Sequence, residues 1–192
     1  MRIRTILILL SILLVLGGVY FAFAMRPKEE TVKPRVYVWD VSDNDIQHIV
    51  ISLPREGNSQ SFIKISQGDK FPWYFDDKEK TPVDQNRWGG GIALLLSGPG
   101  ADRIITEDAS PDQLETYGLT NPSMKITLSL VTKEVLEIDV GDATPNGENY
   151  YVRSPYSNAV ATVDKSWYEV LAALVTNPPY ITTTTSTTGI NQ

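Results

Sequence analysis

The hydrophobic pattern divides the chain into an apolar beginning and a longer, mixed remainder. Residues 5–24 read TILILLSILLVLGGVYFAFA and contain no charged side chain. A helix of this length rises 1.5 Å per residue and spans about 30 Å, the thickness of the hydrocarbon core of a bilayer. The pattern therefore predicts a transmembrane anchor over residues 1–25, with the lipid bilayer as the partner of residues 5–24.

A cleaved signal peptide is the alternative interpretation of this segment. Arg2 and Arg4 form a basic start, and Ala22-Phe23-Ala24 has the small-x-small form that signal peptidases accept. The apolar run exceeds the ~7 to 15 residues of a signal-peptide core, however, and no polar stretch precedes the candidate cleavage site. We therefore expect the segment to remain attached as an anchor.

The charges that flank the apolar run bear on its orientation. Two basic residues precede it and four follow it within residues 26–35, which by simple count favours a cytoplasmic domain. Glu29 and Glu30 dilute the second group, and a very short N-terminus usually goes with translocation of a long C-terminal domain. We expect a single-pass protein of the cytoplasmic or a thylakoid-type membrane, with its domain outside the cytoplasm.

Alternating apolar and polar positions after a proline-bracketed tether at residues 26–35 predict strands. Ile49, Ile51 and Leu53 would share one face of such a strand. The clearest hairpin joins the last two alternating runs around Thr132-Lys133. The predicted strands are residues 36–39, 46–53, 61–65, 73–75, 103–106, 124–130, 136–140, 150–153 and 159–163.

Helix signals occur at three places. Pro82 at a first turn opens a helix predicted to run to about Leu96, although the run Gly89-Gly90-Gly91 would either break it or admit a closely packed backbone. A brief helix follows the cap Ser110-Pro111-Asp112. A third helix begins after Asp164 and ends near Val175. Its expected apolar stripe, which should pack on the sheet, is Trp167, Val170, Leu171 and Leu174.

This order of elements predicts an α+β fold, with a mostly antiparallel sheet and two packed helices. Strands followed by a helix, then strands followed by a helix, suggest a degenerate internal duplication, which no residue-level repeat supports. We place the domain at residues 36–177. Residues 178–192, rich in threonine, lack any apolar period and are predicted to be a disordered tail.

Charge and composition narrow the possible partners. The residues after the apolar run contain 15 Lys and Arg against 23 Asp and Glu, a net charge of −8. Such a domain is repelled by phosphate backbones, so we expect no nucleic-acid partner. The chain contains no cysteine, which excludes disulfides and thiolate metal sites.

A series of short motifs resembles a known family. In chain order they are Val38-Trp39-Asp40, Trp73, Pro82-Val83-Asp84, Tyr117-Gly118-Leu119, Pro122, Val140-Gly141, Thr144-Pro145 and Tyr150-Tyr151-Val152-Arg153. Their order resembles the bacterial family catalogued as domain of unknown function 4340, over about residues 36–175. The resemblance implies a membrane-anchored extracytoplasmic domain without established activity, sometimes encoded beside exporter or gliding-motility components. It implies no catalytic residue. The triple glycine departs from the family's usual leucine and alanine, which suggests a specialised partner at that helix.

Candidate chemistry is sparse. His48, the one histidine, lies mid-strand, where an exposed or hydrogen-bonded residue is usual. Asp40, Asp43 and Asp45 crowd one turn but lack the glycine and distal glutamate of a calcium loop. The adjacent acids Asp76-Asp77, like Glu107-Asp108, would point to opposite faces of a strand and so do not form a catalytic carboxylate pair. We expect no cofactor, no metal and no enzymatic activity.

Aromatic and glycine-rich positions are the candidate partner contacts. Tyr150, Tyr151 and Tyr156 cluster around turns and would form an exposed aromatic patch. Together with Gly89, Gly90 and Gly91 they are the residues we expect to touch a partner.

Three functions fit these observations. The first is a non-catalytic accessory or assembly subunit that contacts other membrane-complex subunits through its domain. The alternative is an extracytoplasmic binding module for a glycan or small ligand, and the third, a hydrolase, has the least support because no nucleophile and base share a motif.

Overall fold

The computed structural model divides the chain into two units, Met1–Pro34 and Arg35–Gln192. It describes residues 36–68, 72–88 and 91–181, together with Leu10, Leu13, Leu14, Leu16, Gly17 and Phe21 of the first unit. The remainder of the predicted anchor, the whole tether at residues 26–35, and the tail from residue 182 onward lie outside the described residues. Among the residues that are described, no helix has the length and apolar character needed to cross a bilayer.

The second unit consists of strands and short helices. Its strands are β1 (Ile46–Leu53), β2 (Asn58–Lys64), β3 (Trp73–Phe75), β4 (Arg103–Thr106), β5 (Met124–Leu130), β6 (Val135–Ala143), β7 (Asn149–Arg153) and β8 (Val160–Asp164). Its described helices are α2 (Gln85–Trp88), α3 (Ile92–Ser97), α4 (Pro111–Thr116) and α5 (Lys165–Thr176). The predicted α+β class is confirmed, and so are the predicted strands from residue 46 onward, most of them to within three residues.

The eight strands form one antiparallel sheet in the order β3-β2-β1-β5-β6-β7-β8-β4. Two meanders, β1 to β3 and β5 to β8, meet where β1 pairs with β5. β4 crosses to the far edge and pairs with β8 instead of extending the first meander. The first half thus contributes a meander of three strands and the second a meander of four, and the internal duplication stays a prediction.

Alternation explains why these residues form a half-buried sheet. The hairpin β5–β6 pairs Ile126 with Ile138 and Leu128 with Leu136, and all four side chains are buried. The turn between the strands places Lys133 at φ 71°, in the left-handed region. One face of the hairpin thereby enters the core, while the alternate positions face outward.

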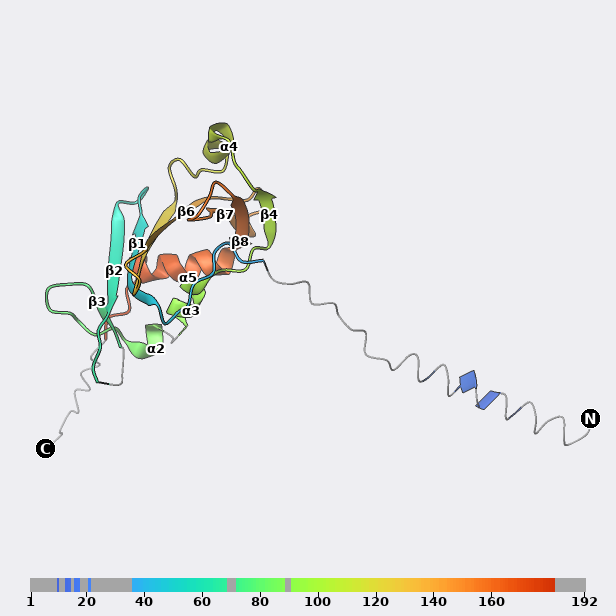
Figure 1. The fold of residues 1–192 in the computed structure, drawn as a ribbon, viewed down its shortest axis with the longest axis horizontal. Coiled ribbons are helices and arrows are strands. Elements are labelled where there is room, and N and C mark those ends of the chain that lie inside the picture. Colours follow the sequence, from blue (N-terminus) through green and yellow to red (C-terminus); the bar gives the residue numbers. More distant parts are fainter. Residues whose placement is uncertain are drawn as a thin grey trace, which may run out of the picture. The chain divides into compact units, whose positions relative to one another are not determined.

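Helix α5 packs on the inner face of the curved sheet, as Figure 1 shows, and it contacts β1, β2, β7 and β8. Asp164 caps it, because its Oδ1 accepts a hydrogen bond from Ser166 N at 2.7 Å. The expected stripe is confirmed at Trp167, Leu171 and Leu174 and wrong at Val170, which is 42% exposed. The neighbouring Val175 is buried in its place.

The single helix predicted from Pro82 to about Leu96 is wrong. Pro82 and Val83 instead form bridges with Tyr74 and Tyr180. Helix α2 starts after Asp84, which caps it, and ends at Trp88; helix α3 begins only at Ile92. Gly91 lies in a turn before α3, and Gly89 and Gly90 lie outside the described residues. Gly91 thus stands at the start of α3, and glycine costs about 1 kcal/mol relative to alanine inside a helix.

The predicted strand at residues 36–39 and the predicted C-terminal bound of the domain both need correction. Residues 36–39 do not form a strand: Tyr37 makes an isolated bridge with Gly100, beside the hydrogen bond from Val38 N to Pro99 O. The folded part continues past the predicted boundary at residue 177: Tyr180 stacks on Phe75, with ring centroids 4.2 Å apart. Arg87 holds this end by donating to the carbonyl oxygens of Asn177 and Pro178 at 2.7 and 2.9 Å.

Candidate functional site

A cleft opens between α3, the loop after it, and the start of α5. Its volume is about 650 Å³. We call it the α3–α5 cleft. It is lined by Tyr37, Asp40, Leu94, Leu95, residues 97–102, Val163, Asp164 and Trp167. Leu94 is 64% exposed and Tyr37 is 47% exposed at this surface. Volumes of about 300–1,000 Å³ are typical of ligand pockets.

Two tryptophans position the wall of the cleft. Trp39 Nε1 donates to Leu96 O at 2.9 Å, and Trp167 Nε1 donates to Leu95 O at 3.0 Å. The two indole rings meet edge to face, with centroids 6.0 Å apart. Carbonyl groups in the last turn of a helix have no partner within the helix, so these two N–H groups satisfy the end of α3 and fix it against α5.

Gly98 permits the close approach that shapes the cleft floor. A Cβ at this position would lie 2.2 Å from Trp39 O. Two backbone hydrogen bonds flank this contact. Val38 N donates to Pro99 O at 3.1 Å, and Val41 N donates to Ser97 O at 2.7 Å. The loop therefore has no room for a side chain at residue 98.

The charged groups of the cleft are all acidic. Asp102 Oδ2 accepts a hydrogen bond from Asn149 Nδ2, and Asp164 accepts from Ser166. Hydrogen bonds from the Ser166 side chain and backbone lower the pKa of the Asp164 carboxyl. The third carboxylate is Asp40, and among the described residues no lysine, arginine or histidine lines the cleft. The arrangement is suited to binding a group that is both apolar and positively charged.

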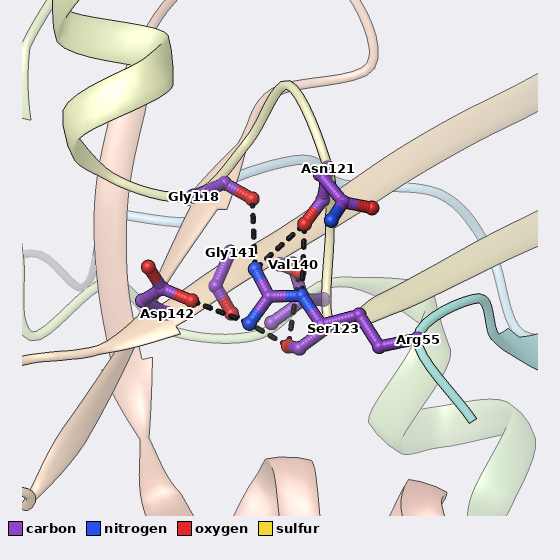
Figure 2. Close-up of polar contacts among 7 residues, drawn as sticks. All are labelled: Arg55, Gly118, Asn121, Ser123, Val140, Gly141 and Asp142. Carbon is purple, nitrogen blue, oxygen red and sulfur yellow. Dashed lines mark hydrogen bonds and ion pairs between the residues drawn. The ribbon is translucent and has the colours of Figure 1, made fainter.

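A second polar site, far from the cleft along the chain, surrounds Arg55 in the β1–β2 turn (Figure 2). Its Nε and Nη2 donate to Asn121 O at 2.9 and 2.6 Å, and its Nη1 donates to Asp142 Oδ1 at 2.6 Å. Beside it, Ser123 Oγ is 2.6 Å from Gly141 O and 3.1 Å from Val140 O. The Arg55 side chain makes four hydrogen bonds to protein groups, the fourth from Nη2 to Gly118 O at 3.4 Å, so we interpret this site as a structural clamp.

The clamp joins the segments that contain the glycine motifs of the sequence. A family model described as "Domain of unknown function (DUF4340)" matches residues 73–177, more than half of the chain. The chain belongs to the DUF4340 family. The match begins at Trp73 and so leaves out β1 and β2, whereas the resemblance described above extends over about residues 36–175. No curated protein and no solved structure matches the chain.

The DUF4340 motifs serve packing in this structure. Gly118 has φ +71°, and a Cβ there would lie 2.5 Å from the Asp142 carboxylate. A Cβ at Gly141 would lie 2.0 Å from Tyr117 O. Both glycines therefore allow the 117–118 turn to rest directly on β6.

The structure does not bring the predicted partner contacts together. Tyr150 stacks on Tyr168 of α5, with centroids 3.9 Å apart, whereas Tyr151 stacks on Tyr117 at 4.6 Å, on the opposite face of the sheet. Successive strand residues point to opposite faces, so the expectation of one exposed patch was wrong. Tyr156 is 56% exposed and lies apart in the β7–β8 turn. Gly91 precedes α3, next to the cleft wall.

A lysine side chain lies against the acidic turn that was considered as a calcium site. The turn at Asp43 holds Lys64, whose Nζ donates to Asp43 O at 3.3 Å and Asn44 O at 3.4 Å. Burial lowers the pKa of the Lys64 ammonium, and the nearby aspartates oppose that shift. No three potential metal ligands gather anywhere in the described ranges.

His48 is part of a chain of side chains on the outer face. Its Nε2 lies 2.8 Å from Asp76 Oδ2, and Lys80 Nζ contacts the other oxygen of Asp76. The Lys80 hydrogen bond, followed by that of His48, lowers the pKa of Asp76. Asp77 instead accepts a hydrogen bond from Thr81 N at 2.9 Å. The two adjacent acids lie in the bend that follows β3, and they have separate partners.

Sequence reasoning missed the cleft, although one signal for it exists. Leu94, Leu95 and Leu96 are consecutive, and a helix cannot turn three consecutive side chains toward one core. Leu96 is fully buried, and Leu94 is left facing out. An exposed leucine beside a glycine-proline loop was therefore visible in the sequence as a surface feature.

Proposed function

We propose that this DUF4340 protein is a non-catalytic accessory subunit, anchored in a membrane by residues 5–24, which binds another membrane protein through the α3–α5 cleft. The observation that carries the proposal is an open cleft of about 650 Å³ with exposed leucine and tyrosine side chains at its rim. Exposed apolar residues gathered beside a concavity are typical of protein contact sites. The uncharged 20-residue run in the sequence supports the anchor.

The rigidity of the cleft wall also supports binding. Both indole N–H groups hold α3 in place from behind, so a partner would meet a preformed surface. A preformed surface loses less conformational entropy on association than a mobile one. In the part of the chain that the structure describes, the lining contains no histidine, lysine or arginine that would serve as a base or a cation in catalysis.

The test is recovery of partners by the full-length chain, extracted from its native membrane in a mild non-ionic detergent. Leu94→Asp places a charge on the cleft rim, and Val135→Asp is the matched control because Val135 is 55% exposed at the start of β6, away from the cleft lining. Wild type and V135D should recover the same small set of membrane proteins, depleted at least tenfold with L94D. Recovery of the bait alone, or equal recovery with L94D, would contradict the proposal.

A binding module for a small ligand or glycan is the second candidate. The cleft volume falls in the range of ligand pockets, and Trp167 lies in its lining. Titration of a soluble metabolite or glycan pool should then change tryptophan fluorescence, and Trp167→Phe should remove most of that change. If this response appears while no membrane protein is recovered, the second candidate replaces the first.

A further inference from the structure

The chemistry of the α3–α5 cleft indicates what kind of partner segment it fits, and this inference rests on the proposed function. Asp40, Asp102 and Asp164 line the same cleft as Leu94 and Leu95. Asp40 and Asp102 are exposed, so their side chains are accessible to a partner. The cleft thus combines an apolar rim with negative charge on several sides.

The protein itself does not neutralise these charges within the described residues. The hydrogen bonds to Asp102 come from the amide of Asn149, and those to Asp164 come from Ser166, so all of these donors are uncharged. Among the ion pairs of the described residues, none includes Asp40, Asp102 or Asp164. Other acids in the domain contrast with them: Asp76, Asp139 and Asp142 each contact a lysine or arginine.

A metal ion does not explain the carboxylates. A divalent cation requires several oxygen ligands converging within about 2.6 Å of one point. The described residues contain no such group of three side chains, in the cleft or elsewhere. The charges are spread along the cleft, which suits positive groups that are themselves spread along a chain.

The charge of the whole domain acts in the same direction. Residues 36–192 contain 11 Lys and Arg against 21 Asp and Glu, a net charge of −10. A field of this sign increases the encounter rate with a basic partner and repels an acidic one. Long-range steering and local chemistry therefore favour the same class of ligand.

We infer that the α3–α5 cleft binds a segment of the partner protein in which lysine or arginine residues flank aliphatic ones. The aliphatic side chains pack against Leu94, Leu95 and Tyr37. The basic groups pair with Asp40, Asp102 and Asp164 at the margin. Apolar contact supplies much of the affinity, and the carboxylates determine which segments bind.

The experiment uses the full-length chain in dodecyl maltoside and three fluorescein-labelled peptides of one length. Their repeating cores are Lys-Leu-Lys-Leu-Lys, Gln-Leu-Gln-Leu-Gln and Glu-Leu-Glu-Leu-Glu, and binding is followed by fluorescence anisotropy. The cleft variant is Asp40→Asn with Asp102→Asn. Its control, Glu56→Gln with Glu107→Gln, removes the same charge from exposed positions outside the cleft lining.

The lysine peptide should bind wild type and the control variant alike, and bind the cleft variant at least tenfold more weakly. Its affinity should fall as salt rises, and the other two peptides should bind at least tenfold more weakly. Equal losses in the control and cleft variants would reduce the effect to general electrostatics and overturn the inference. Equal binding of the glutamine peptide would overturn it too.

The two proposals fail in distinguishable ways. If native partners are recovered and lost with L94D, but no peptide prefers the cleft carboxylates, the accessory function stands and the basic-segment inference falls. If the lysine peptide binds through Asp40 and Asp102 while no membrane protein is recovered from the native membrane, the proposed function falls and the cation-binding chemistry of the cleft stands.

Discussion

Gly141 packs so closely on Tyr117 that a Cβ at residue 141 would stand 2.0 Å from the Tyr117 carbonyl oxygen. The adjacent Asp142 N donates to that same oxygen at 2.9 Å, so the turn cannot retreat without losing the bond. We predict that Gly141→Ala lowers the free energy of unfolding by about 3 kcal/mol, the upper end of the usual cost of overpacking. Urea denaturation measures it, and a loss below about 1 kcal/mol would show that the turn yields easily.

Gly118 and Gly147 offer a matched pair, because both have φ +71° and only one is crowded. Alanine at Gly147 meets no atom within 4 Å and should cost only the left-handed backbone, about 1–2 kcal/mol. Alanine at Gly118 must also displace the Asp142 carboxylate from Arg55, so its loss should exceed that of G147A by at least about 1 kcal/mol. Equal thermal shifts in the two variants would contradict the clamp.

The sequence alone predicts the elements next to Gly118 and Gly141 but not the contacts of Arg55. Gly118 follows the helix predicted after the cap at Ser110, and Gly141 directly follows the strand predicted at residues 136–140. The contacts of Arg55 were not predicted, because its partners Asn121 and Asp142 are 66 and 87 residues away and nothing in the β1–β2 turn indicates them. Contacts of this range depend on strand order, and the crossing of β4 to the edge beside β8 leaves no mark in the hydrophobic period.

Asp139 is a buried charge on the outer face of β6, with a side chain only 6% exposed between Arg153 and Lys125. Its Oδ1 accepts no hydrogen bond from the described residues, and Lys125 Nζ lies 3.6 Å away. Arg153→Met leaves this carboxylate poorly paired and should cost about 3 kcal/mol. Asp139→Asn leaves two cations that reach water, 33% and 42% exposed, and should cost about 1 kcal/mol.

The order of these two losses is the informative result. Glu137→Gln, at an exposed position two residues earlier on the same strand, should change the free energy of unfolding by less than about 0.5 kcal/mol. If Asp139→Asn proves more damaging than Arg153→Met, the buried carboxylate stabilises the fold in a way that pairing does not explain.

The helix predicted from Pro82 shows why the candidate site escaped sequence reasoning. Its apolar positions fit a 3.6-residue period, yet Val83 is needed as a bridge partner of Tyr180, which lies almost a hundred residues later. Tertiary pairing overrode the local preference and shortened the helix to α2 and α3. Ile92 and Leu96 are still buried as that period requires, whereas Leu95 is 37% exposed and lines the cleft together with Leu94. The candidate contacts chosen from turns and tyrosines were local features, whereas the cleft is assembled from three separate segments.

Asp76 should make stability depend on pH, because Lys80 and then His48 lower its pKa in the folded chain. A carboxyl with a depressed folded pKa stabilises the fold above its unfolded pKa of about 3.9 and loses that contribution as pH falls through the folded value. The free energy of unfolding of wild type should therefore exceed that of Asp76→Asn by about 0.5–1 kcal/mol at pH 7, as expected for a partly exposed pair. Near pH 2 the two values should be equal. Lys80→Met should reproduce most of the loss at pH 7, whereas Lys78→Met, for a neighbouring lysine that makes no ion pair within the described residues, should not. Urea titrations at pH 2, 4 and 7 separate the outcomes: a difference between wild type and D76N that persists at pH 2 reports lost packing instead of lost charge.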